Sequence, residues 1–168
     1  MTETEHWARI PEFPTYLISD LGNIFNLYTD NMMRTSFNTY RHVKITLTNH
    51  ITGERYDRSV RKLVAEVHVP KLNDLYDEAM LLDGNLENLR ADNIMWRPRW
   101  FVWKYSRQLK ITQPAHYFNL KVKNVVRGFI YNSVIEAGKT EGLLFDDIWK
   151  STYTGLEIFP YGDAFEII

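Results

Sequence analysis

The chain has 168 residues and no cysteine. Disulfide bonds and zinc–thiolate sites therefore cannot stabilise it, and its stability must come from the burial of apolar side chains. Aromatic residues supply much of that surface, with five Trp, ten Tyr and nine Phe, and each large ring can bury on the order of 150–250 Å². We expect one ordinary domain or two very small ones, held together without cross-links.

Several functional classes are excluded by what the sequence lacks. No apolar stretch approaches the roughly 18 residues that a transmembrane helix requires, and residues 1–5 are acidic, unlike the start of a secretory signal. No P-loop, nucleophile elbow or His-Glu-x-x-His motif is present. We therefore expect a cytoplasmic protein with no membrane partner and no signature of a common enzyme class.

The N-terminal half is predicted to form short strands around one helix. Two prolines exclude a helix near the N-terminus, and residues 7–25 are expected to form a turn, a strand, a turn and a strand. Residues 41–48 alternate apolar and polar side chains, which is typical of a half-buried strand. Apolar residues at helical spacing predict a helix over 60–69, and residues 79–82 are expected to form a short buried strand.

The C-terminal half is predicted to combine helices with a hairpin. A helix is expected over 100–109, and residues from 121 onward predict a strand, a turn and a strand. Ser133 followed by Glu136 is a capping-box pattern that opens a helix. A second short helix is expected over 144–150. The whole order of elements predicts an α+β fold.

The net charge of −1 conceals an uneven distribution. Residues 97–134 contain eight Lys or Arg and no Asp or Glu, whereas residues 1–30 and 135–168 have net charges of −4 and −5. A basic block attracts polyanions within about a Debye length, roughly 8–10 Å, whatever the total charge is. A solvated helix face is the plainer interpretation of the same block.

Two stretches of this sequence resemble a known protein family. The first, Trp7-x-x-Ile10-Pro-x-Phe13 followed by Tyr16-x-Ile18-Ser-x-x-Gly22-x-Ile24, is similar to the small N-terminal module of phage and intron homing endonucleases. The second begins at residues 60–70 and continues through Asp83-Gly-Asn to Trp96. It resembles the HNH nuclease domain of the same proteins, in which a helix precedes a ββα-metal unit. More loosely, residues 127–148 resemble the small helix-turn-helix-type repeats that often follow such domains.

The resemblance implies an α+β chain in three parts. These are a small N-terminal β module over 1–50, a degenerate ββα-metal (HNH-like) unit over 51–110, and a C-terminal β-hairpin with short helices over 111–168. The resemblance also implies an origin in a phage or a mobile element, and hence a place in the cytoplasm of the host cell.

The positions that carry chemistry in the family are occupied differently here. Family members typically read His-x-Asp-Gly-Asn, and their histidine activates water as a general base while nearby residues hold a divalent cation. In this chain the position of the base falls on Leu81, the residue before it is Met80, and the ligand position in the next helix falls near Val102. None of these side chains can accept a proton or bind a hard cation. We expect no catalytic residue, no bound metal and no cofactor.

Residues with structural roles in the motif are retained. Asp83 and Gly84 are expected to form a turn, Asn93 to tie the loop, and Trp96 to join the core. A sequence that keeps the scaffold and loses the chemistry indicates a degenerate nuclease.

Other side chains could replace the missing ligands. His68 ends an apolar helix and is better explained by burial or capping, and His116 is expected on an exposed loop. Asp77 and Glu78 are adjacent on a strand, so their side chains point to opposite faces. Metal chemistry through unfamiliar ligands is therefore the weakest of the hypotheses.

The basic block falls where HNH proteins meet the duplex, so the resemblance implies that its cations contact phosphates. The helical spacing of Trp100, Trp103 and Arg107 favours burial of both rings, whereas exposed rings could stack on unpaired bases. A second basic cluster in the N-terminal half is diluted by neighbouring acidic residues. The candidate DNA-binding residues are Arg97, Arg99, Lys104, Arg107, Lys110, Arg41 and Lys44.

Three functions remain open. The first is a catalytically inactive HNH-like protein that binds DNA in a regulatory or occluding role. The second is a protein that binds and inhibits or modulates a host nucleic-acid enzyme, which fits the acidic chain ends better than strong nonspecific DNA binding does. The third is an active, metal-dependent nicking endonuclease with unfamiliar ligands. No oligomeric state is predicted.

Overall fold

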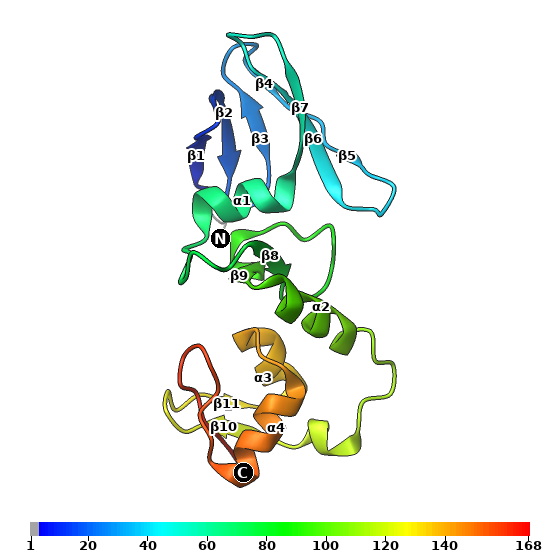
Figure 1. Cartoon of the computed structure of the whole chain (residues 1–168), viewed down its shortest axis with the longest axis vertical. Helices are drawn as coiled ribbons and strands as arrows, with labels where there is room; N and C mark the ends of the chain where they lie inside the picture. The colour runs from blue at the N-terminus through cyan, green and yellow to red at the C-terminus, as the bar shows by residue number, and fades with distance from the viewer. Residues whose placement is uncertain (1–3) are drawn as a thin grey trace. The chain divides into compact units, whose positions relative to one another are not determined.

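The structure, a computed structural model, describes residues 4–168; residues 1–3, which begin the predicted N-terminal module, lie outside the described part. The chain divides into two compact units, Met1–Arg99 and Trp100–Ile168. Within the described residues, small sheets and four α-helices make up an α+β fold, as predicted (Figure 1). No helix within residues 4–168 is long and apolar enough to cross a lipid bilayer.

Two antiparallel sheets open the unit Met1–Arg99 (Figure 1). The first contains, in spatial order, β1 (Trp7–Ile10), β2 (Phe13–Ser19), β3 (Ile24–Asn26) and β4 (Asn31–Met32). The second contains β5 (Ser36–Phe37), β6 (Val43–Thr48) and β7 (Arg55–Ser59). The first strand corrects the expectation of a turn at residues 7–10, because its backbone pairs with β2. The alternating burial along β6 confirms the predicted half-buried strand.

Helix α1 (Val60–His68) packs the two sheets and the following hairpin into one core. It begins directly after β7 and ends before Pro70, as predicted. Its apolar face is buried through Val60, Leu63, Val64 and Ala65, and full burial of a side chain such as Leu stabilises by about 1.5–3 kcal/mol. The two sheets lie on one side of α1, and β8 (Glu78–Leu81) with β9 (Ile94–Arg97) lies on the other (Figure 1).

The turn between β2 and β3 lies against the hairpin loop. Gly22 has a φ of +89°, and a Cβ atom there would come within 2.9 Å of the Cβ atom of Leu89. Both the positive φ and the close approach require glycine. The Ala91 amide also donates to the Asp20 carbonyl oxygen at 2.7 Å. One hydrophobic core therefore joins the sheets to the hairpin. The predicted division of the chain into three parts, with boundaries after residues 50 and 110, remains a proposal.

The long loop between β8 and β9 is held by a pair of side chains at its two ends. The Asn93 side-chain amide donates to Asp83 Oδ1 at 2.8 Å and to the Asn88 carbonyl at 2.9 Å, while its oxygen accepts from the Asp83 amide at 3.1 Å. Gly84 follows with a φ of +75°. The Trp96 indole donates to the carbonyl oxygens of Ala65 and Val69, at 3.3 and 3.2 Å, and so fixes β9 to the end of α1.

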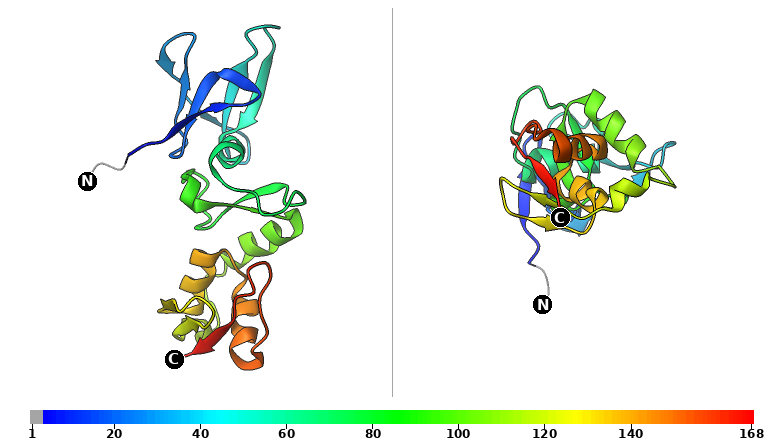
Figure 2. Two further views of the ribbon diagram at one scale, coloured as in Figure 1. Left: turned by 90° about the vertical axis from the view of Figure 1, so that its left-hand side faces the viewer. Right: turned by 90° about the horizontal axis from the view of Figure 1, so that it is seen from below.

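The unit Trp100–Ile168 packs helices against a small sheet (Figure 2). Its elements are α2 (Arg99–Gln108, beginning at the unit boundary), the 3-10 helix η2 (His116–Asn119), β10 (Val122–Asn124), β11 (Ile130–Tyr131), α3 (Val134–Glu141), α4 (Phe145–Thr154) and β12 (Phe165–Ile167). The predicted hairpin is confirmed as β10 and β11. Strand β12, which the sequence did not predict, pairs with the other side of β10. Ser133 Oγ accepts from the Glu136 amide at 3.0 Å, which confirms the predicted helix cap.

A buried polar cluster fixes the end of this unit to its hairpin. Arg127 forms ion pairs with Asp163 and, at 2.8 Å, with Glu141. Asn124 donates to Asp163 at 2.9 Å, and the Tyr131 hydroxyl donates to Glu141. Burial disfavours the charged form of Asp163, but the hydrogen bonds from Arg127 and Asn124 outweigh it, so the pKa of this carboxyl is lowered. Burial and the contact with Glu141 raise the pKa of Tyr131.

Asn93→Ala should lower the free energy of unfolding by about 1–3 kcal/mol, because it removes three part-buried hydrogen bonds that hold the loop, two to Asp83 and one to the Asn88 carbonyl. Urea unfolding followed by circular dichroism measures the loss. The matched control is Asn85→Ala, which removes one hydrogen bond to the Glu87 amide in an exposed turn and should cost less than about 1 kcal/mol. Equal losses in the two variants would contradict the structural role of Asn93.

Asp163→Asn should destabilise the protein by about 3 kcal/mol at neutral pH, because Arg127 loses a buried partner. The lowered pKa of Asp163 means that its contribution is present above the unfolded carboxyl pKa of about 4 and is lost as the pH falls through the folded value. The difference between variant and wild type in urea unfolding should therefore shrink in acid. Asp146→Asn, at an exposed position of α4, is the control. A difference that does not change with pH would contradict the pairing.

Candidate functional site

Strand β8 carries apolar side chains at the two positions where the resemblance to HNH nucleases places a general base and a metal ligand. Met80 is fully buried and Leu81 is 5% exposed. They lie opposite Met95 and Ile94 on β9, so the hairpin is apolar at this point. Val102 is half-buried on α2. A hard divalent cation requires oxygen ligands, and a general base requires a titratable group. These residues therefore do not fit the metal site of an HNH nuclease.

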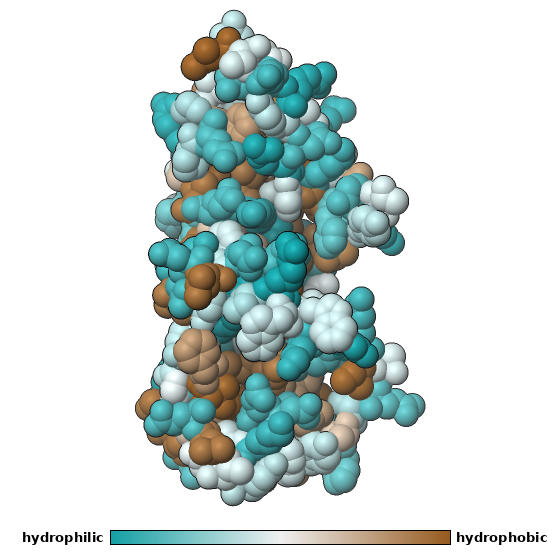
Figure 3. All heavy atoms as spheres, viewed as in Figure 1, coloured by the Kyte–Doolittle hydropathy of each residue, from teal (hydrophilic) through white to brown (hydrophobic). Residues whose placement is uncertain are grey.

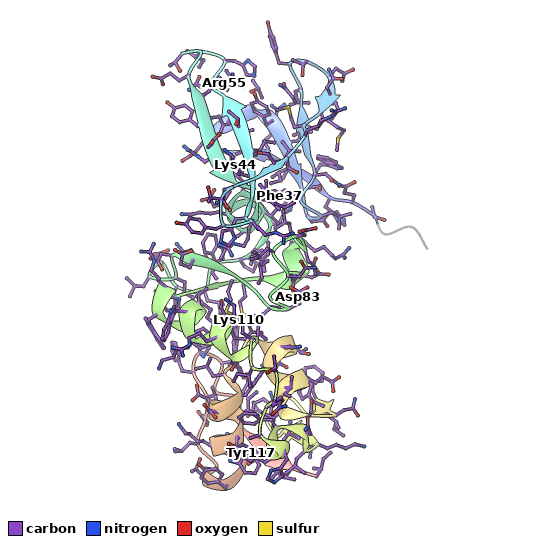
Figure 4. All side chains as sticks on the ribbon, turned by 90° about the vertical axis from the view of Figure 1, so that its right-hand side faces the viewer. Phe37, Lys44, Arg55, Asp83, Lys110 and Tyr117 are labelled. Carbon is purple, nitrogen blue, oxygen red and sulfur yellow. The ribbon has the colours of Figure 1, made fainter. Side chains whose placement is uncertain are left out.

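The carboxylate of Asp83 accepts three hydrogen bonds that hold the loop. Its Oδ1 accepts from the Asn85 amide and from Asn93, both at 2.8 Å, and its Oδ2 accepts from the Asn88 side chain at 2.6 Å. Burial alone would raise the pKa of Asp83, but the bonds from Asn88, Asn85 and Asn93 lower it. The side chain stands in the loop that follows β8 (Figure 4). Its hydrogen bonds assign it to the scaffold.

The two histidine candidates have no neighbours that would make a metal site. His68 Nε2 donates to the Ile18 carbonyl at 3.0 Å, which ties the end of α1 to β2. His116 is exposed on η2. Within residues 4–168, no three His, Asp or Glu side chains lie close enough together to hold one ion.

The carboxylates of Asp77, which precedes β8, and Glu78, which begins it, point to different surroundings. Glu78 accepts from the Arg99 guanidinium at 3.1 Å. Asp77 lines a hollow of about 430 Å³ together with Lys62, Lys71 and other side chains. The divergence follows from the alternation of side chains along an extended chain, and it prevents the two carboxylates from sharing a ligand.

Helix α2 is fixed to its own unit by one face. Phe101 is 9% exposed, and Tyr105 is fully buried and donates to the Gly138 carbonyl at 3.4 Å. Gln108, one turn further along, donates to the Leu143 carbonyl at 3.1 Å and accepts from the Phe145 amide at 2.9 Å. Residues spaced by four and three lie on one face of a helix. This face orients α2 and decides which side chains it presents to solvent.

The opposite face of α2 exposes both tryptophans, which corrects the prediction that they are buried. Trp100 is 62% exposed and Trp103 is 59% exposed. Lys104 Nζ lies 5.4 Å from the centroid of the Trp100 ring, and Arg107 Cζ lies 4.6 Å from that of Trp103. Large side chains of intermediate hydropathy, drawn pale, lie over α2 in Figure 3. The helical spacing correctly predicted a common face, but the buried face of α2 is the one that carries Phe101 and Tyr105.

The other cations of the basic block differ in their access to solvent. Arg97 is 2% exposed, with its guanidinium donating to the Trp96 carbonyl at 3.2 Å and lying over the Tyr76 ring. This burial corrects the expectation that Arg97 faces DNA. Arg99 is exposed but paired with Glu78. Lys110 follows α2 and is exposed (Figure 4).

The second basic cluster is partly neutralised. Lys44 Nζ lies 2.6 Å from the Asp57 carboxylate on the neighbouring strand, and this contact lowers the pKa of Asp57. Arg41 is exposed, with a φ of +61° in the turn before β6. Figure 4 places Lys44 and Arg55 along the same pair of strands. Because Lys44 has an acidic partner, this surface carries less positive charge than the sequence count indicates.

Comparison with known proteins identifies a fold but no sequence family. No family model matches the chain, and no curated protein matches it. Among solved structures, it is similar to one described as "DNA binding and cleavage by the HNH homing endonuclease I-HmuI". The identity is 20%, the likeness covers 97% of this chain and 98% of the other, and the TM-score is 0.55. The chain therefore has an HNH endonuclease-like fold along nearly its whole length.

Restoring family residues on β8 alone should not produce cutting. Met80→Asp combined with Leu81→His adds a carboxylate and a proton acceptor, but Val102 still supplies no ligand. We expect neither this variant nor the wild type to nick supercoiled plasmid in Mg²⁺ or Mn²⁺, as measured by conversion to open circles on a gel. Thermal unfolding checks that the variant folds.

Two results would contradict this expectation. Efficient cutting by the folded double variant would show that the interpretation of Val102 is wrong. Nicking by the wild type that needs a divalent cation and is lost in Asp83→Ala or His68→Ala would favour an active nuclease with unfamiliar ligands.

Proposed function

We propose that this protein binds DNA through an HNH-type scaffold without cutting it, and that it acts in a regulatory or occluding role. The observation that carries the proposal is the burial of Met80 and Leu81 in an apolar hairpin. The resemblance assigns these positions to the base and a ligand, and neither side chain can do that work. A phage or mobile-element origin, with action in the host cytoplasm, belongs to the same proposal.

The exposed cations of α2 and of the segment after it support DNA as the partner. Lys104, Arg107 and Lys110 are exposed, and residues 97–134 contain no Asp or Glu. Each Lys or Arg that neutralises a phosphate releases counterions, which makes binding favourable and dependent on salt. Of these three cations, Lys104 lies near Asp147 of α4, whose charge offsets part of its own.

The solved structure of similar fold gives further support. Its description names both DNA binding and DNA cleavage for I-HmuI. We carry only the binding over to this chain, because binding depends on surface charge and shape, whereas cleavage depends on side chains that are apolar here.

A second candidate function is the capture of a protein partner, such as a host nucleic-acid enzyme. Apolar side chains at the β10–β11 turn favour it, since Val126, Phe129 and Ile130 are 59%, 54% and 63% exposed. The acidic chain ends fit this function as well. Co-purification of a host protein that survives nuclease treatment, together with failure to bind DNA, would favour it over the first proposal.

Duplex DNA binding should weaken steeply with salt and depend on the cations of α2. For a labelled duplex in fluorescence anisotropy, Arg107→Gln combined with Lys110→Gln should weaken binding and reduce the slope of log K against log salt by about two, or roughly 0.9 for each phosphate that the variant no longer neutralises. Both residues are exposed, so the variant should fold like the wild type.

The charge-matched control is Arg34→Gln combined with Lys139→Gln, two exposed residues outside both basic clusters. We expect this control to change the slope much less. Duplex binding by the wild type that is insensitive to salt, or equal slopes in the two double variants, would contradict the proposed DNA surface.

A further inference from the structure

Two tryptophans and two cations form a row along the solvent face of α2, which we call the α2 ring face (Trp100, Trp103, Lys104 and Arg107). The rings are three residues apart, so they lie on neighbouring turns of the helix, about 4.5 Å apart along its axis. Lys104 lies over the first ring and Arg107 over the second, at 5.4 and 4.6 Å. Each cation occupies one side of its ring, and more than half of each tryptophan stays exposed.

The core of the unit Trp100–Ile168 does not use these rings. That core is built from Phe118, Phe145, Ile148 and other residues outside α2, and α2 attaches to its unit through Tyr105 and Gln108. Trp100 has one edge contact with Phe101 at 5.8 Å between centroids. Two exposed indoles on neighbouring turns of one helix give a partner a large apolar surface to bury.

The chemistry of the α2 ring face fits a partner that is both flat and anionic. A nucleobase stacks on an indole whatever its identity, because every base has a π face. A cation held on a ring can also reach a phosphate near the stacked base. Asp147 of α4 lies close enough to Lys104 to offset part of its charge, so Arg107 is the stronger phosphate contact of the two. In duplex DNA both faces of each base are already covered by its neighbours, so only unpaired bases can meet these rings.

We infer that the α2 ring face binds unpaired bases of single-stranded DNA, with Trp100 and Trp103 as stacking platforms and Lys104 and Arg107 on the adjacent phosphates. This inference rests on the proposed DNA-binding function and names the state of DNA that α2 recognises. A lipid surface fits less well, because an interfacial helix inserts a wide apolar face, whereas α2 exposes two indoles and buries Phe101 and Tyr105. The protein therefore recognises melted, looped or nicked DNA more tightly than a closed duplex.

The test compares two probes in fluorescence anisotropy at low salt, a labelled twelve-nucleotide oligo(dT) and a labelled blunt-ended duplex formed from two complementary strands. Trp100→Ala combined with Trp103→Ala should weaken oligo(dT) binding about tenfold or more, with less than about a twofold change for the duplex. Trp100→Phe combined with Trp103→Phe keeps a stacking surface and should restore most of the affinity for oligo(dT). Trp7→Ala, a partly exposed tryptophan on β1, is the control and should change neither probe. Circular dichroism and thermal unfolding check that each variant is folded.

The outcomes separate the inference from the proposed function. If the wild type binds the duplex but the folded Ala variant binds oligo(dT) as well as wild type does, the inference is wrong and the proposed function stands. If oligo(dT) binds through the rings and the duplex does not bind, the inference stands and duplex binding is wrong. Binding to neither probe overturns both. Loss of sedimentation with phosphatidylserine vesicles in the Ala variant, without loss of oligo(dT) binding, would assign the rings to a membrane surface and overturn the inference.

Discussion

The burial of the β8 side chains limits what chemistry the hairpin can perform. Leu81 belongs to the core that α1 forms with the two sheets, and Met80 is fully buried on the same strand. Placing an ionised group in such a position costs several kcal/mol unless partners surround it, and the hairpin register sets Met95 and Ile94 opposite. At these two positions the hairpin therefore offers apolar side chains, which supply neither an oxygen ligand nor a proton acceptor.

Several acidic side chains of the unit Met1–Arg99 are engaged in holding the structure. Asp83 accepts three hydrogen bonds within its loop, Glu78 is paired with Arg99, and Asp57 is paired with Lys44. Positive charge is therefore partly neutralised by acidic partners in the N-terminal sheets, whereas it stays exposed on the solvent face of α2. A net charge near zero is compatible with a strongly basic local surface, because screening limits each charge to its neighbourhood.

Local sequence patterns predicted most of the helices and strands. The others form through strand pairing between residues that are far apart in the sequence. The apolar spacing of residues 60–69 and the Ser133 cap predicted α1 and α3 correctly. Strand β12 could not be predicted, because it pairs Phe165 with Asn124, far apart in the chain. At the candidate site, spacing placed Trp100 and Trp103 on one face but could not tell which face is buried. Arg97 is buried, although a charged residue in a basic stretch of sequence suggests a surface position.

Gln108 gives the helix that carries the rings a fixed orientation. Its amide bridges the Leu143 carbonyl and the Phe145 amide, at the junction where α4 begins without a side-chain cap of its own. With Tyr105 anchored one turn earlier, α2 cannot roll about its axis without breaking these bonds. The indoles are therefore preorganised, and a partner that settles on them sacrifices little conformational entropy of the protein. A rigid platform of this kind suits brief, repeated encounters with a flexible strand.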